Sequence, residues 1–210
     1  MLDLHTNVLT KEAKMLFPFL AHFKDDFYVA GGTGLALQIG HRISVDFDLF
    51  SLSPIKKTFL KKVEEVFKGK TLKILVNNES ELTLFVGEVK CTFLYYPFPV
   101  ILSLVQASPI PLLSAKEILV TKAYTIGRRG ELKDYVDIYS GLKRNCSILS
   151  EVIDVAKKKY GEAFNDRLFL EQLLYTEDLE NIAITMLDGN VPSKMEMINY
   201  FSEIIKNIVL

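Results

Sequence analysis

The sequence predicts an α+β fold, in which a small mixed α/β half is followed by an all-helical half. Strand-like and helical patterns alternate up to about residue 96, and only helical patterns follow the proline-punctuated segment 97–111. Of the 210 residues, 49% are hydrophobic, which is enough to bury a sizeable core. We therefore expect two domains, an α/β domain over residues 1–110 and a helical domain over residues 111–210.

Local signals define the elements of the N-terminal half. Thr10 is a suitable N-cap for the first helix, and Gly40 can end the second helix in a left-handed conformation. Ser53-Pro54 is a typical helix start, a capping residue followed by proline at the first position. The expected elements, in chain order, are a helix (10–24), a strand (27–30), a helix (33–39), a strand (44–50), a lysine-rich helix (54–68) and three strands (71–77, 81–86 and 89–95).

Only helices are expected in the C-terminal half. Ser114 and Glu117 have the spacing of a capping box, in which the two side chains bond each other's backbone N–H groups. The expected helices cover 114–126, 132–143 and 148–159, with at least one more in each of 165–187 and 193–208.

Composition narrows the class of protein. The net charge of −1 gives no global basic field, so binding of nucleic acid would need a local patch. Cys91 and Cys146 lie far apart and indicate neither a zinc site nor a disulfide framework, which fits a reducing compartment. The N-terminus lacks the pattern of a secretory signal, and four prolines interrupt the most apolar region, 95–113. We expect a cytoplasmic protein with no membrane partner.

Asp46 and Asp48 stand one residue apart in the strand expected over 44–50. Alternation along a strand places both carboxylates on one face, roughly 7 Å apart at Cα, and directs Val45, Phe47 and Leu49 to the other face, into the core. Two carboxylates this close repel each other, and a divalent cation would offset the repulsion. Mg²⁺ (or Mn²⁺) favours one or two carboxylates together with phosphate oxygens. The alternative is an edge strand whose aspartates face water.

The turn Gly31-Gly32-Thr33 lies just upstream of this strand, at the start of a helix. Glycine lets the backbone approach a ligand closely, and the free N–H groups of a helix N-terminus favour an anion such as phosphate. The Thr33 hydroxyl can add one donor. A turn that suits phosphate and a strand that suits Mg²⁺ together predict a site for a nucleoside triphosphate (NTP), whereas the alternative is a tight turn without a ligand.

Taken together, "GGT", the short helix, "GHRIS" and "DFDLF" resemble the nucleotidyltransferase superfamily with the DNA polymerase β fold and, within it, the AbiEii/AbiGii toxin family. The resemblance implies a mixed sheet flanked by helices, followed by a helical bundle. It also implies that the turn Gly31–Thr33 holds the triphosphate and that Asp46 and Asp48 bind the metal and are catalytic. Arg42 of the "GHR" element is expected to add positive charge near the phosphates.

A second group of charged residues lies in the helical half. Asp134 and Asp137 share a helix face, which from spacing alone could be a solvated face with intrahelical ion pairs. With Lys122 they resemble the later motifs of the same family. The resemblance implies that Lys122 contacts the triphosphate and that Asp134 is important for activity, either as a general base for an acceptor hydroxyl or by holding Lys122 in place. Lys133 and Asp137 are additional candidates.

The third carboxylate used by many enzymes of this fold is not evident. The strand expected over 89–95 contains no acidic residue, and Glu88 lies in the turn before it. Three alternatives remain open: the metal site uses two carboxylates, Asp134 or Asp137 completes it, or the activity is weak.

The leading hypothesis is a Mg²⁺-dependent nucleotidyltransferase that moves a nucleoside monophosphate (NMP) from an NTP to a hydroxyl acceptor. The family resemblance implies a toxin of a toxin–antitoxin or abortive-infection system, with a cellular RNA such as a tRNA 3′ end as one acceptor and a separate antitoxin protein as partner. The alternatives are a nucleotide-binding module without turnover and an antibiotic-modifying nucleotidyltransferase.

Overall fold

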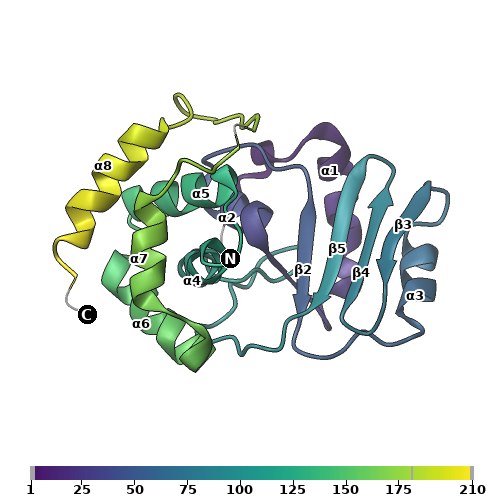
Figure 1. Cartoon of the computed structure of the whole chain (residues 1–210). Coiled ribbons are helices and arrows are strands. Elements are labelled where there is room, and N and C mark those ends of the chain that lie inside the picture. The colour runs from purple at the N-terminus through teal and green to yellow at the C-terminus, as the bar shows by residue number, and fades with distance from the viewer. Residues whose placement is uncertain (1–2, 181, 209–210) are drawn as a thin grey trace.

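The computed structural model describes residues 3–180 and 182–208 as a sheet joined to a group of helices (Figure 1). The strands are β1 (Tyr28–Ala30), β2 (Phe47–Ser51), β3 (Leu72–Asn77), β4 (Glu81–Val86) and β5 (Val89–Tyr95). The α-helices are α1 (Lys11–Leu16), α2 (Gly31–Ile39), α3 (Phe59–Val66), α4 (Ala115–Ile126), α5 (Leu132–Lys143), α6 (Leu149–Tyr160), α7 (Asp166–Leu174) and α8 (Lys194–Ile205). Short 3₁₀ helices cover η1 (Thr6–Val8), η2 (Phe17–Phe23) and η3 (Gly161–Ala163). No helix in these ranges is long and apolar enough to span a membrane.

The five strands form one mixed sheet in the order β1-β2-β5-β4-β3. Strands β2 and β5 are parallel, and the other neighbours are antiparallel. The register places Asp48 beside Thr92 and Leu49 beside Phe93. Paired side chains point to the same face of a sheet, so Asp48 and Thr92 share one face and Leu49 and Phe93 share the other. The predicted α+β class is confirmed.

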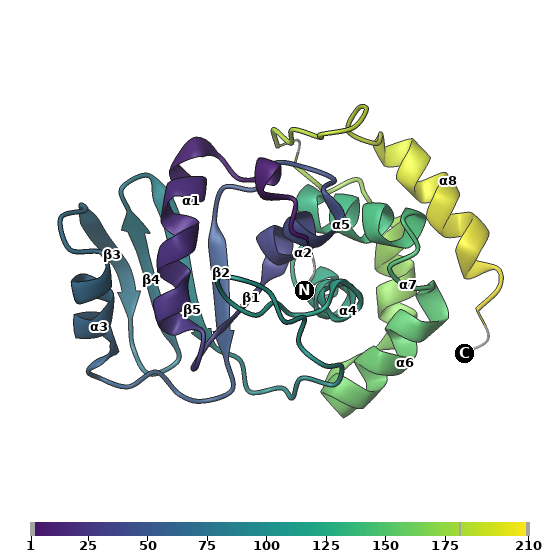
Figure 2. The same cartoon turned by 180° about the vertical axis from the view of Figure 1, so that it is seen from behind.

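One face of the sheet is covered by helices α1, η2 and α3 (Figure 2). The contact is largely aromatic: the ring centroids of Phe23 and Phe59 each lie 4.9 Å from that of Phe93, in edge-to-face arrangements. Such pairs add to the apolar burial that fixes the sheet against its helices. This face is therefore core, and the polar face with Asp48 is left for a site.

The opposite face of the sheet is directed toward the helical half, and α2 lies between the two (Figure 1). Buried residues up to Leu112 belong mainly to the cluster around the sheet, and those from Leu113 onward belong to the cluster of α4 to α8. Because α2 packs against both α4 and α5, the two halves share an interface. The boundary between residues 110 and 111 stays a prediction.

The predicted helix start at Ser53-Pro54 is wrong, since α3 begins only at Phe59. The backbone N–H of Ile55 donates to the carbonyl of Glu79, in the turn between β3 and β4, which ties this segment to the sheet. The N–H of Ser53 bonds the Ser51 side chain. These partners come from outside the segment and replace the first turn of a helix.

Two further predictions need correction near the site. Strand β2 begins at Phe47 and not at residue 44, because the N–H of Ser44 bonds the carbonyl of Val8 instead of a sheet neighbour. Val45, predicted to be core, is 53% exposed. Ser114 caps α4 as expected, but Glu117 does not complete a capping box, since its carboxylate accepts bonds from other partners.

Candidate active site

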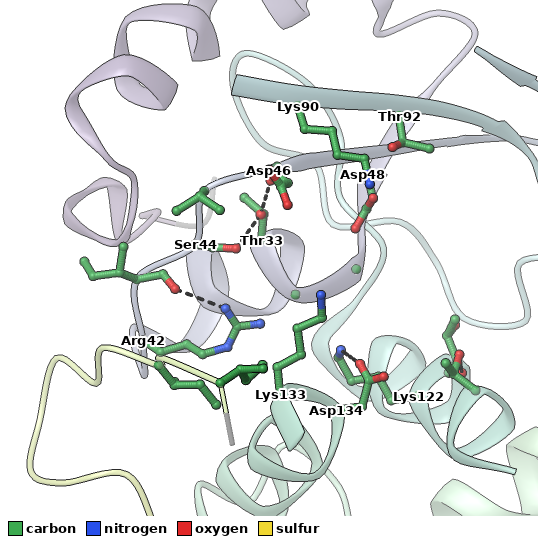
Figure 3. A pocket seen from close by; sticks show the side chains of 18 of the residues that line it. Thr33, Arg42, Ser44, Asp46, Asp48, Lys90, Thr92, Lys122, Lys133 and Asp134 are labelled. Atoms are coloured by element: carbon green, nitrogen blue, oxygen red, sulfur yellow. Dashed lines mark hydrogen bonds and ion pairs between the residues drawn. The ribbon is translucent and has the colours of Figure 1, made fainter. Parts of the chain in front are cut away.

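A cavity of about 560 Å³ lies between the polar face of the sheet, the N-terminus of α2 and helices α4 and α5 (Figure 3). Its volume is in the range of small-molecule sites. It brings together most of the residues that the sequence singled out: Gly31, Gly32, Thr33, Arg42, Asp46, Asp48, Lys122, Lys133 and Asp134. The remaining candidate, Asp137, does not line the cavity but is fully buried beside it.

Asp46 and Asp48 reach the cavity in different ways. Asp48 is carried by β2, whereas Asp46 lies just before the strand begins. The Thr33 hydroxyl donates to the backbone carbonyl of Asp46 and accepts a bond from Ser44. The first turn of α2 therefore fixes the position of Asp46, and this gives Thr33 a positioning role. Direct contact of Thr33 with a phosphate stays a prediction.

The charges around the two aspartates suit a bound cation. Burial raises the pKa of Asp48, and the nearby Asp46 raises it further, while Lys122, Lys133 and Lys90 act in the opposite direction. Neither carboxylate forms an ion pair within residues 3–180 and 182–208. Two half-buried carboxylates without a protein counter-ion match the donor set that Mg²⁺ or Mn²⁺ prefers.

A third acidic ligand does not join this pair. Over the part of the chain that the structure describes, no group of three or more His, Cys, Asp or Glu side chains is arranged to hold a metal ion. Asp134 and Asp137 are instead held by cations, as described below. The alternative in which Asp134 or Asp137 completes the metal site is therefore not supported, and the other two, a site with two carboxylates and a weak activity, stay predictions.

Gly31 and Gly32 allow two side chains to approach the start of α2. Gly31 has a φ of +62°, and a Cβ there would lie 2.2 Å from Oδ2 of Asp48. A Cβ on Gly32 would lie 2.2 Å from Nη2 of Arg42. Helix α2 has no side-chain N-cap, so the N–H groups of its first turn lack the partner that a cap supplies. The glycines therefore place Asp48 and Arg42 against a helix N-terminus that favours an anion.

We predict that Gly31→Ala destabilises the protein and weakens binding of an NTP analogue. The new methyl group meets the Asp48 carboxylate, and alanine also costs about 1–2 kcal/mol in a left-handed conformation. Gly87→Ala is the matched control, because Gly87 has a φ of +61° with nothing within 4 Å of its Cβ position. Urea unfolding and titration with a fluorescent NTP analogue measure both effects. Equal stability and equal binding in the two variants would contradict the prediction.

A buried cluster of ion pairs centres on Asp137. Its carboxylate accepts bonds from Nε2 of His41 (2.7 Å), from Nε and Nη2 of Arg42 (2.7 and 2.9 Å), and pairs with Nζ of Lys122 at 2.8 Å. Lys122 also donates to Oδ1 of Asp134 at 2.6 Å. Asp134 is 1% exposed and Asp137 is fully buried, so the alternative of a solvated helix face is wrong.

These contacts fix the charges of the cluster. Burial alone would raise the pKa of Asp137, but Lys122, Arg42 and the hydrogen bond from His41 hold it well below its usual range. Burial alone would lower the pKa of Lys122, but Asp137 and Asp134 raise it. Burial lowers the pKa of His41 despite its bond to Asp137. Asp137 is therefore ionised and His41 neutral at pH 7.

The two cationic residues predicted to lie near the phosphates, Lys122 and Arg42, are both engaged in ion pairs. Lys122 lines the cavity but is already bound by two carboxylates, and Arg42 is bound by one. Asp134 holds Lys122 in place through Oδ1. Its Oδ2 is buried and accepts no hydrogen bond from the described residues, although Nε of Arg129 lies 3.6 Å away as an ion-pair partner. A buried, unsatisfied carboxylate oxygen is a costly feature in a folded protein unless it serves a ligand. Asp134 thus has one oxygen without a hydrogen bond from the described residues.

Some cavity residues were missed by the sequence interpretation. Lys90 and Thr92 reach the cavity from β5, and residues 182–185 cover part of it. Period-two alternation in β5 would have placed Lys90 and Thr92 on one face, but which face points to the site depends on the pairing with β2. The segment 182–185 has no local signal, because it is held by bonds such as that from the N–H of Ile43 to the carbonyl of Thr185.

The chain is similar to known proteins in sequence and in fold. Residues 15–87 match the family model described as the nucleotidyl transferase AbiEii toxin of type IV toxin–antitoxin systems. An uncharacterized protein of Aquifex aeolicus is 28% identical over 156 residues, which are 73% of this chain and 75% of that protein. The nucleotidyltransferase toxin MenT4 of Mycobacterium tuberculosis has a similar structure, with a TM-score of 0.61, 15% identity, and coverage of 92% of this chain and 81% of the other. A protein of H. pylori described as a nucleotidyltransferase is similar with a TM-score of 0.58, 15% identity and coverage of 94% and 96%.

Proposed function

We propose that this chain, whose residues 15–87 match the family model of the nucleotidyl transferase AbiEii toxins, transfers an NMP from an NTP to a hydroxyl acceptor with Mg²⁺ or Mn²⁺ as cofactor. The observation that carries the proposal is that two half-buried carboxylates, without counter-ions among the described residues, and a helix N-terminus without a side-chain cap lie in one cavity. Neither feature alone would favour a triphosphate over any other anion.

The residues of the cavity have distinct roles in the proposed reaction. Asp46 and Asp48 hold the metal ion, which when bound supplies charge stabilisation to the phosphate oxygens. The N–H groups at Gly31 and Gly32 bind the triphosphate at the start of α2. Thr33 keeps Asp46 in position through its backbone carbonyl.

The acceptor side is assigned to Asp134. The acceptor hydroxyl oxygen attacks the α-phosphorus, the bond from that phosphorus to the bridging oxygen breaks, and pyrophosphate leaves. The proton of the hydroxyl passes to Oδ2 of Asp134, the oxygen that has no hydrogen-bond partner among the described residues. Lys122 keeps Asp134 in position through an ion pair, and Asp137 in turn holds Lys122.

The biological role follows from the family. We propose that the chain acts as the toxin of a toxin–antitoxin system, that its acceptor is a cellular RNA such as tRNA, and that a separate antitoxin protein is its partner. The second candidate is nucleotide binding without turnover, which the lack of a third acidic ligand in the described residues favours.

One experiment separates these candidates. Purified protein is incubated with each of the four NTPs labelled at the α-phosphate, together with total cellular RNA, total protein or aminoglycosides as acceptors. The proposal predicts a labelled RNA. A labelled drug would indicate an antibiotic-modifying enzyme, and stabilisation by NTP without any labelled product would indicate the binding module.

A further inference from the structure

Lys90 occupies a distinctive position beside the two aspartates. In the parallel pair, Asp48 lies next to Thr92, and Lys90 lies two residues earlier on the same face of β5. The side chain of Lys90 extends toward Asp48 of β2 (Figure 3). On β5 this face carries lysine and threonine and no acidic residue. Glu81, at the start of β4, also lines the cavity, but its carboxylate accepts a hydrogen bond from Thr83.

The charge of Lys90 is available to a ligand. Four other cationic side chains line the cavity, and each forms an ion pair: Arg42 with Asp137, Lys122 with Asp134 and Asp137, Arg129 with Glu131 and Asp134, and Lys133 with Glu131. Lys90 forms none with the residues that the structure describes. It is half-buried, so its ammonium group is held within the cavity by the strand.

We propose that Lys90 binds the phosphate oxygens of the NTP as a fixed cation, and that the site accordingly holds one divalent ion where a two-metal site would hold two. This inference rests on the proposed function and adds to it the metal stoichiometry and a phosphate ligand. An ammonium group is a compact point charge that suits phosphate. Its charge also opposes a second dication on the same face, where the described residues form no group of three side chains that could hold a metal ion.

The first arm of the test measures binding without turnover. NTP analogues with a methylene group between the α- and β-phosphates are titrated in the presence of Mg²⁺, using the base that binds wild type best. Lys90→Met is expected to lower affinity about tenfold, the scale of one charge-assisted bond. Lys90→Arg keeps the charge and is expected to stay within about threefold of wild type. Lys73→Met, an exposed strand lysine outside the cavity, is the control and should bind like wild type.

The second arm counts metal ions. Electron paramagnetic resonance of Mn²⁺ in the complex with the same analogue is expected to give one bound ion per chain. Two bound ions in wild type, or wild-type affinity in Lys90→Met, would overturn the proposal about Lys90. If wild type binds no analogue at all, the proposed nucleotidyltransferase function fails instead, so the two failures are distinguishable.

Discussion

Asp137→Asn is expected to lower the free energy of unfolding by about 3–5 kcal/mol, the cost of leaving buried charges without their partner. In the folded protein the carboxylate of Asp137 is bound by Arg42, Lys122 and His41, and all of these lie in the interior. Asparagine has nearly the same shape but carries no charge. Asp134, which pairs with Lys122, would then be the remaining carboxylate of the cluster for the two buried cations, Arg42 and Lys122.

Thermal and urea unfolding measure this effect. A loss of this size corresponds to a fall in Tm of about 6–20 °C for a chain of this length. Asp154→Asn is the matched control, since Asp154 is an exposed helical aspartate outside the cluster, and it should change stability little. A change of less than about 1 kcal/mol in Asp137→Asn would show that the cluster does not hold the two halves together.

The same cluster predicts a dependence of stability on pH. The pKa of Asp137 is lower in the folded protein than in the unfolded chain, where an aspartate has a pKa of about 3.9. Its stabilising contribution is therefore complete above about pH 4 and is lost as the pH falls through the folded-state value. As the pH is lowered below about 4, the free energy of unfolding should fall more steeply in wild type than in Asp137→Asn. Equal slopes would contradict this assignment.

The double variant Asp46→Asn/Asp48→Asn is expected to lose NMP transfer by at least about a thousandfold while remaining folded. Both proposed metal ligands lose their charge, and with it the stabilisation of the phosphate oxygens. Stability should be unchanged or increased, because burial and the nearby Asp46 raise the pKa of Asp48 and so disfavour its ionised form when no cation is bound. Loss of activity without loss of stability distinguishes a site from a structural element.

The matched control removes the same two charges elsewhere. Asp25 and Asp26 are both exposed and do not line the cavity, and Asp25→Asn/Asp26→Asn should retain wild-type transfer. Transfer of labelled NMP and thermal unfolding are measured on all three proteins. Wild-type rates in Asp46→Asn/Asp48→Asn would reject the proposed chemistry.

Local patterns predicted much of the fold. Strands β4 and β5 and helix α5 have the predicted bounds, since turn residues or an amphipathic repeat define each of them within a few positions. The start of α3 was mispredicted because Ile55 bonds the carbonyl of Glu79, a partner 24 positions away. Local propensity at Ser53-Pro54 contains no information about such a partner.

The site was predictable to the extent that its residues lie in short motifs. Gly31, Gly32, Asp46 and Asp48 stand close together in the chain, and a strand and a helix N-terminus suffice to relate them. Asp137 was only an additional candidate, because its importance comes from Arg42 and His41, which are 95 and 96 positions away. Lys90 was missed for a similar reason, since its position near Asp48 depends on the register between β2 and β5.

The central claim, that an NMP moves from the NTP to an acceptor, is tested most directly by the fate of two labels. Wild-type protein, Mg²⁺ and cellular RNA are incubated in parallel with NTP labelled at the α-phosphate and with NTP labelled at the γ-phosphate. The predicted result is an RNA that carries the α-label, with the γ-label released as pyrophosphate. Label from the γ-phosphate on the acceptor, or free labelled NMP without any modified acceptor, would contradict it.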